Sequence, residues 1–192
     1  MKSICVYCGS AAGNSPAFHQ AATALAHQLV SHDLELVYGG GGVGLMKMTA
    51  DEVLRLGGHV TGVIPKALME REVGHGGLSK LHVVANMHER KALMADLSDG
   101  FIALPGGIGT MEELFEMFTW LQLGFHHKPL GILNVNGFYD HLLQFLEHAV
   151  LSGFLKPEHN ALLIKENDPS QLINRMKHFE DAIHHKPIFQ TS

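Results

Sequence analysis

Short apolar runs alternate along this chain with longer amphipathic segments, and turn or capping residues mark the boundaries between them. Asn14-Ser15-Pro16 supplies an N-cap and a first-turn proline, so a helix is predicted to follow the first apolar run. Gly57-Gly58 predicts the end of the next helix. The pattern predicts strands at residues 3–7, 35–38, 59–64, 81–84, 101–104, 130–135 and 162–164. It predicts helices at residues 16–31, 45–56, 87–97, 110–123, 139–151 and 169–179.

This alternation favours the α/β class. Strands joined by helices of about ten or more residues imply right-handed crossovers and a mostly parallel sheet covered by helices on both faces. We therefore expect a single doubly wound, Rossmann-like domain over residues 1–185, with a C-terminal tail at 186–192. Ligands of such sheets bind where the strands end and the helices begin. Residues 69–79 show no clear periodicity and are expected to form a flexible loop near that edge.

The composition of the chain excludes some classes of function. The formal net charge is −5 with histidine neutral, which excludes a basic nucleic-acid-binding module. Since no apolar run approaches the roughly 20 residues that span a membrane, we expect a soluble cytoplasmic protein that binds neither nucleic acid nor membrane. Cys5 and Cys8 have the spacing of a redox C-x-x-C motif, but in a strand they point to opposite faces, which favours core packing.

Two glycine clusters follow predicted strands. Gly39, Gly41 and Gly44 can be written as the dinucleotide fingerprint G-x-G-x-x-G, but no acidic residue ends the next strand to hold a ribose. Neither cluster continues into the Gly-Lys-Ser/Thr of a P-loop. Hydride transfer and Walker-type ATP hydrolysis are therefore disfavoured. The first cluster is either a tight structural turn or a loop approached closely by a phosphate or sugar.

The second cluster, residues 104–113, is more informative because it joins a strand to a helix N-terminus. Free backbone N–H groups and the positive end of the helix dipole form an anion site there. Glycines at 106, 107 and 109 remove side chains that would keep a phosphate from that backbone, and Thr110 adds a hydroxyl. A phosphomonoester is the expected ligand.

Glu113 admits two interpretations. Thr110-x-x-Glu113 is a capping box, in which the glutamate closes back on the N-cap amide. Alternatively, the helix dipole lowers the pKa of Glu113 and keeps it ionised beside a bound phosphosugar, where it orients water or stabilises positive charge on the sugar.

Met87-His88-Glu89-Arg90-Lys91 opens the helix before the second cluster. Neighbouring helical residues point about 100° apart, so Arg90 and Lys91 cannot both face one point, and one of them is structural or both are solvated. Arginine is effectively never deprotonated, so Arg90 is expected to act as an electrostatic clamp and not as a proton donor.

At these residues the sequence resembles the LONELY GUY (LOG) family of cytokinin-activating phosphoribohydrolases, whose members are often labelled lysine decarboxylases. The resemblance covers nearly the whole chain, and its separated motifs occur in one order. The matching stretches are Val6-Tyr7-Cys8-Gly9-Ser10, Tyr38-Gly39-Gly40, Gly44-Leu45-Met46, Gly62-Val63-Ile64-Pro65, Met87-His88-x-Arg90-Lys91, Pro105-Gly106-Gly107-x-Gly109-Thr110-x-x-Glu113, Thr119-Trp120-x-Gln122-Leu123-Gly124 and Lys128-Pro129.

The resemblance implies hydrolysis of the N-glycosidic bond of a purine riboside 5′-monophosphate, a cytokinin nucleotide or AMP, to free base and ribose 5-phosphate. It implies no metal or other cofactor, a homodimer or larger homo-oligomer, and Arg90 and Glu113 as the catalytic pair. The residues that it implies for substrate binding are Ser10, Gly44, Glu72, Met87, Lys91, Gly106, Gly107, Ile108, Gly109, Thr110 and Thr119. The acid that protonates the leaving base stays open between His88 and solvent.

This sequence also departs from the family pattern. Lys47 stands where Gly-Leu-Met is commonly followed by another glycine, and Ala11 and Phe18 replace a usual serine and tyrosine. Residues 73–80 diverge as well, which leaves the preferred base open. The rival hypothesis is a non-catalytic nucleotide- or molybdenum-cofactor-binding carrier on the same scaffold, which needs the phosphate loop but not Arg90 with Glu113. Pyridoxal-dependent decarboxylation is the weakest interpretation, because no lysine has a Schiff-base context.

The helix after the second cluster is apolar around more than one face. Its large apolar side chains are Phe115, Met117, Phe118, Trp120 and Leu121. Such a helix is either buried on two sides within one chain or part of a subunit interface.

Overall fold

Parallel strands form the centre of the molecule, which is seen here in a computed structural model that describes residues 1–72 and 74–179, without the side chains of residues 70–72. Within that part, seven strands form one sheet in the order β4-β3-β2-β1-β5-β6-β7, and every neighbouring pair is parallel. The strands are β1 (Ser3–Tyr7), β2 (Glu35–Tyr38), β3 (Val60–Pro65), β4 (Lys80–Val84), β5 (Phe101–Ala103), β6 (Leu130–Leu133) and β7 (Leu163–Glu166). The predicted α/β class and doubly wound sheet are confirmed.

Helices connect the strands. They are α1 (Pro16–Ser31), α2 (Gly44–Arg55), α3 (Lys66–Glu72), α4 (Met87–Asp96), α5 (Ile108–Leu123), the 3₁₀ turn η1 (Val135–Gly137), α6 (Asp140–Leu151), α7 (Pro157–Asn160) and α8 (Pro169–Lys177). The predicted caps are confirmed: the Ser15 side chain accepts a hydrogen bond from the amide of Ala17, and Gly57 follows α2 with φ 82°. β1, α1 and β2 have the bounds that the sequence predicts, and the Ser15 cap explains where α1 begins.

Some predictions were wrong. Residues 69–72 belong to α3 and not to a loop, and α7 and η1 were not predicted. These elements span seven, four and three residues, too few for the 3.6-residue period to show in a sequence. α5 begins two residues before the predicted start, because its N-cap is Gly107. The predicted tail at 186–192 lies outside the described residues.

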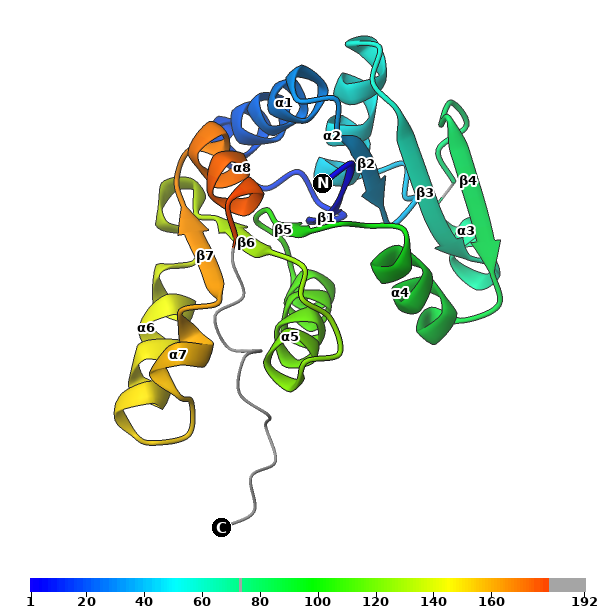
Figure 1. Cartoon of the computed structure of the whole chain (residues 1–192). Coiled ribbons are helices and arrows are strands. Elements are labelled where there is room, and N and C mark those ends of the chain that lie inside the picture. The colour runs from blue at the N-terminus through cyan, green and yellow to red at the C-terminus, as the bar shows by residue number, and fades with distance from the viewer. Residues whose placement is uncertain (73, 180–192) are drawn as a thin grey trace.

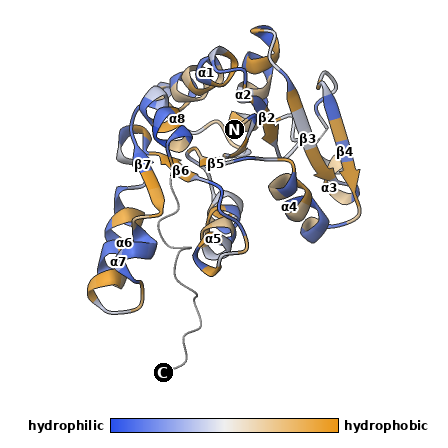
Figure 2. Ribbon diagram, in the orientation of Figure 1, coloured by the Kyte–Doolittle hydropathy of each residue, from blue (hydrophilic) through white to orange (hydrophobic). Residues whose placement is uncertain are grey.

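Two hydrophobic layers enclose the sheet. In Figure 1, α1, α2 and α8 lie on one side of the sheet, and α4, α5 and α6 lie on the other. Figure 2 shows hydrophilic and hydrophobic stretches mixed along α1 and α6, as expected for helices that cover a core. Cys5 and Cys8 are buried free thiols in opposite layers, which confirms core packing. Among the described helices, none has the length and apolarity needed to cross a bilayer.

The order of strands determines where a site can form. From β1 the chain adds β2, β3 and β4 on one side and β5, β6 and β7 on the other, so the direction of winding reverses between β1 and β5. The loops that leave β1 and β5 therefore diverge and leave a crevice at the carboxyl edge. The amide of Gly9, after β1, donates to the carbonyl of Pro105, after β5, at 3.1 Å. This contact joins the two loops at the reversal.

Candidate active site

Arg90 joins three parts of the carboxyl edge. It lies in the first turns of α4 and is 8% exposed. Its Nε donates to the carbonyl of Val63 in β3 at 3.2 Å, and its Nη2 donates to the carbonyl of Gly39 after β2 at 3.3 Å. Its Nη1 lies 3.5 Å from Oε1 of Glu113 in α5. These contacts fix a permanent positive charge with one side facing a carboxylate.

Gly39 makes room for this arginine. A Cβ atom at Gly39 would lie 1.9 Å from Nη2 of Arg90, so any side chain there would displace the guanidinium. The first glycine cluster therefore makes room for Arg90 directly, a role that its fingerprint-like spacing does not indicate.

Glu113 is buried and its carboxyl group titrates near neutrality. It is 9% exposed, and burial raises its pKa from 4.5 to about 7, although the charge of Arg90 opposes this shift. The predicted lowering of this pKa by the helix dipole was wrong. Loss of hydration outweighs the positive charges of Arg90 and Lys91, and the neighbouring carboxylates Glu112 and Glu116 raise the pKa further. Near neutral pH the group can therefore hold or release a proton.

The capping-box interpretation of Glu113 was wrong as well. The N-cap of α5 is Gly107, with no side-chain cap, so Thr110 lies inside the helix instead of capping it. The amides of Ile108, Gly109 and Thr110 have no acceptor among the described residues. A Cβ atom at Gly107 or Gly109 would meet no described atom within 4 Å. The start of α5 is therefore an open cluster of donors in front of the Arg90–Glu113 pair, suited to an anion.

Gly106 and Thr110 pack closely against each other in this turn. A Cβ atom at Gly106 would lie 2.1 Å from Oγ1 of Thr110, and Thr110 is buried. Gly106 is therefore needed for packing against the threonine.

At the start of α2, by comparison, the backbone amides already have acceptors within the protein. The amides of Leu45 and Met46 donate to the carbonyl of Gly9 at 3.1 and 3.4 Å. Gly44 has φ 58°, and a Cβ atom there would lie 2.3 Å from the backbone of Ser10. Gly44 thus packs on the loop after β1, and Ser10 itself is exposed beside it.

The other residues implied by the resemblance occupy different places. Sδ of Met87 lies 3.8 Å from Nη1 of Arg90. Nζ of Lys91 contacts Glu112 at 2.5 Å and Glu116 at 3.1 Å. Burial opposes the charge of Lys91, but these carboxylates outweigh it and raise the pKa of the ammonium. In this chain Lys91 therefore joins α4 to α5 beside the Arg90–Glu113 pair.

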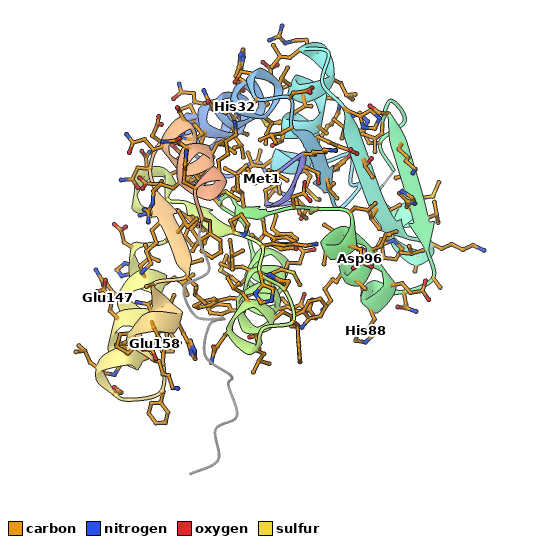
Figure 3. All side chains as sticks on the ribbon, in the orientation of Figure 1. Met1, His32, His88, Asp96, Glu147 and Glu158 are labelled. Atoms are coloured by element: carbon orange, nitrogen blue, oxygen red, sulfur yellow. The ribbon has the colours of Figure 1, made fainter. Side chains whose placement is uncertain are left out.

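Thr119 and His88 are not brought to this pair. Thr119 is exposed on α5, roughly 15 Å along the helix axis from Gly109. Glu72 ends α3, and its side chain lies outside the described part of the structure. His88 is exposed, and Figure 3 shows its side chain pointing away from the body of the protein. His88 is therefore poorly placed to protonate a leaving group held at Arg90 and Glu113.

Sequence reasoning missed the residues that hold α4 in place. Oδ1 of Asn86 accepts from the amide of Glu89 at 2.9 Å, and Oε2 of Glu89 accepts from the amide of Ala85 at 2.9 Å. A cap similar to the one expected at α5 thus occurs at α4, except that Glu89 accepts from the residue before the N-cap Asn86; its Asn-x-x-Glu spacing is readable in the sequence. Within the described ranges, no group of three or more His, Cys, Asp or Glu side chains could hold a metal ion.

The chain is similar to proteins of known family. The family described as "Possible lysine decarboxylase" matches residues 46–176. The cytokinin riboside 5'-monophosphate phosphoribohydrolase LOG7 of Arabidopsis thaliana is 47% identical over 179 residues, 93% of this chain and 82% of the relative. The probable cytokinin riboside 5'-monophosphate phosphoribohydrolase LOGL1 of Oryza sativa subsp. japonica is 51% identical over 176 residues, 92% of this chain and 79% of the relative.

Solved structures share the fold at low identity. The molybdenum cofactor carrier protein of Chlamydomonas reinhardtii superposes with a TM-score of 0.67 and 20% identity, covering 92% of this chain and 96% of the carrier. The molybdenum cofactor binding protein of Rippkaea orientalis gives a TM-score of 0.67 and 20% identity, covering 93% of this chain and 97% of that protein. Similarity at this level shows a common scaffold, which different functions can share.

Proposed function

Because the chain belongs to the LONELY GUY (LOG) family of cytokinin riboside 5'-monophosphate phosphoribohydrolases, we propose that it is an N-glycosyl hydrolase of purine riboside 5′-monophosphates. The products are the free purine base and ribose 5-phosphate. One observation carries the proposal. A buried arginine and a buried glutamate, with Nη1 of Arg90 3.5 Å from Oε1 of Glu113, face each other beside the open amides of α5.

The phosphate binds at the start of α5. The amides of Ile108 and Gly109 donate to its oxygens, and the helix dipole favours its charge. Held at this non-reacting end, the nucleotide presents its N-glycosidic bond to Arg90 and Glu113, and such positioning lowers the barrier to reaction.

The ionised Glu113 carboxylate assists both cleavage of the N-glycosidic bond and attack by water. As the bond between C1′ and N9 breaks, its electron pair leaves with the base and positive charge develops on the sugar, which the carboxylate stabilises. Glu113 then accepts a proton from a water molecule, whose oxygen forms the new bond to C1′. Solvent supplies the proton to the base, because His88 is exposed on the outside of α4. Arg90 keeps its charge throughout and orients the carboxylate.

The substrate class is a 5′-monophosphate of adenosine or of an N6-substituted adenosine. The names of the plant relatives support a cytokinin nucleotide, and AMP shares every group that the α5 turn and the catalytic pair engage. Thus AMP is proposed as a second substrate of the same site.

A carrier function is the second candidate. Its support is limited to the shared scaffold of the molybdenum-cofactor proteins, at 20% identity. A carrier has no need of a buried Arg90–Glu113 pair, because taking two charges out of water costs stability without aiding binding. The pair therefore favours the enzyme.

Product analysis tests the proposal. The purified protein is mixed with AMP and with N6-isopentenyl-AMP, and base and ribose 5-phosphate are measured by chromatography. We expect both products from at least one nucleotide, with a loss of about 100- to 10,000-fold in Glu113→Gln. Glu147→Gln makes the same chemical change on α6, at an exposed position labelled in Figure 3, and should react like wild type. Intact nucleotides that nevertheless bind would favour the carrier.

We also propose that the protein is a homodimer and that it is located in the cytoplasm. Large apolar side chains are exposed after α5 and around α6, where Phe125 is 72% and Phe154 is 91% exposed, and such patches mark interaction surfaces. Light scattering should give twice the 21.0 kDa of one chain, and subcellular fractionation tests the location.

A further inference from the structure

Two departures from the family pattern meet at one carboxylate. Lys47 lies in the first turn of α2, and His75 lies in the connection between α3 and β4. Nζ of Lys47 contacts Oδ2 of Asp51 at 2.5 Å, and Nε2 of His75 lies 2.7 Å from Oδ1 of the same residue. These partners outweigh the burial of Asp51 and lower the pKa of its carboxyl group.

The geometry fixes the orientation of the imidazole. The amide of Gly77 donates to Nδ1 of His75 at 3.3 Å, so Nε2 carries the proton and donates to Asp51. The His75 side chain is only 9% exposed, whereas that of Asp51 is 47% exposed. The histidine is therefore held between its own turn and α2, and it is not a solvated surface group.

The contact between His75 and Asp51 holds residues 74–77 against the first glycine turn. Gly74 pairs with Gly41 in an antiparallel bridge, and the amide of His75 donates to the carbonyl of Gly40 at 3.3 Å. The preceding carbonyl, that of Gly39, accepts from Arg90. Consecutive carbonyls of one turn thus hold the catalytic arginine and the His75 segment.

The positions of the phosphate turn and of Arg90 along the carboxyl edge of the sheet determine the direction in which the nucleotide lies. The phosphate turn belongs to β5, and Arg90 rests on carbonyls at β2 and β3, beyond β1. With the phosphate at α5 and the reacting bond at Arg90 and Glu113, the base extends toward β2 and β3. The Gly74–Gly77 segment lies on that side, because it is bridged to Gly41 after β2.

We infer that His75, held by Asp51, is a positioning residue that sets the affinity of this enzyme for the base of its substrate. It acts through the Gly74–Gly77 segment, which it holds against the turn after β2. The inference rests on the proposed function for the direction of the nucleotide. Lys47 supports the same carboxylate from the exposed side of α2.

Binding measurements in the inactive Glu113→Gln background test the inference. Calorimetry compares AMP, N6-isopentenyl-AMP and ribose 5-phosphate, which has the phosphate but no base. His75→Ala should weaken binding of at least one nucleotide about tenfold, consistent with the loss of a hydrogen bond to a charged group. Binding of ribose 5-phosphate should stay within about twofold, since its phosphate binds at α5. His75→Gln, whose amide reaches about as far as Nε2, should recover most of the affinity.

His27 offers a matched control, because it makes the same kind of contact with a carboxylate of α2. Nε2 of His27 contacts Glu52, the neighbour of Asp51, at 3.0 Å, but His27 belongs to α1 and not to the segment bridged to the glycine turn. His27→Ala should leave all three affinities unchanged. In the active enzyme, His75→Ala should raise KM about tenfold while kcat changes less than about threefold, because Arg90 and Glu113 keep their contact.

The outcomes separate the two proposals. Equal weakening of ribose 5-phosphate and the nucleotides would show a general structural role for His75, and unchanged affinities would show no role; either result overturns the inference. If wild type binds but does not hydrolyse the nucleotides, the proposed function fails while the binding comparison still decides the role of His75. If wild type binds no nucleotide, both proposals fail.

Discussion

The two glycine turns at the carboxyl edge look alike in sequence and differ in structure. Both join a strand to a helix: Gly39–Gly44 runs into the start of α2, and Pro105–Gly109 runs into the start of α5. In the first, side chains at Gly39 and Gly44 would overlap Arg90 and the Ser10 backbone, and carbonyls of the β1 loop occupy the first amides of α2. In the second, side chains at Gly107 and Gly109 would meet only open space.

This difference shows that the spacing of glycines in a sequence does not indicate what occupies the space left by the absent side chains. That space can hold other parts of the protein or a ligand. The first turn makes room for other parts of the protein, including Arg90. The second turn leaves backbone donors free, as an anion site requires. The phosphate is therefore assigned to the second turn, and the predictions below probe that assignment.

Gly39→Ala should give the largest effect. Its Cβ atom would lie 1.9 Å from Nη2 of Arg90, so the guanidinium must move away from Glu113. A displacement of about 1 Å at a catalytic group costs on the order of 100-fold in rate, so kcat/KM should fall by at least that factor. Steady-state kinetics with AMP measure the loss, and circular dichroism checks the fold. Near-normal activity in a folded variant would show that the first turn does not serve Arg90.

Glu113→Gln should change the pH dependence of stability. A carboxyl group with its pKa raised from 4.5 to about 7 contributes stability that is full below about pH 4.5 and is lost as pH rises through 7. Glutamine removes this loss, so the variant should be more stable than wild type by about 1–3 kcal/mol at pH 8.

Urea denaturation at pH 5 and pH 8 measures this difference. The advantage of Glu113→Gln should be small at pH 5, where the wild-type carboxyl group is protonated in the folded state. An advantage that is the same at both pH values, or a loss at pH 8, would mean that the helix dipole governs Glu113 after all.

Alanine at one glycine of each turn should destabilise the protein in the first turn but not in the second. Gly44→Ala places a side chain at φ 58° and against Ser10, which should cost about 1–3 kcal/mol. Gly109→Ala enters open space in the first turn of a helix and should be neutral or stabilise by up to about 1 kcal/mol. Thermal unfolding of both variants measures the contrast. Equal destabilisation would remove the distinction between the turns.

Local signals predicted much of this fold. Ser15-Pro16 and Gly57-Gly58 lie at the helix ends that they indicate, and the alternation of strands with helices gives the parallel sheet. The remaining errors arise where a short element lacks a period, as in α3, or where a cap can occur at more than one place. Asn86 and Glu89 take the cap motif expected at Thr110 and Glu113.

The placement of Arg90 and Glu113 near the helix starts at the carboxyl edge could be predicted from the sequence, but their contacts could not. Arg90 binds carbonyls 27 and 51 residues away in the sequence, at Val63 and Gly39, and no local pattern indicates such partners. The raised pKa of Glu113 likewise depends on burial that arises only when α4, α5 and the sheet come together. Lys91 matches a family motif, yet the carboxylates that hold it became visible only in the fold.

The most direct test removes one backbone donor from the second turn. Ile108 is the first residue of α5 and is 86% exposed, and the residue before it, Gly107, has extended dihedral angles. Proline is therefore tolerated there, and Ile108→Pro deletes an amide N–H while the helix and its packing remain. Calorimetry with ribose 5-phosphate in this variant measures the contribution of the amide. The assignment predicts a stable protein whose affinity for ribose 5-phosphate falls about tenfold, by the loss of a charge-assisted hydrogen bond; unchanged affinity in a folded variant would contradict a phosphate site at α5.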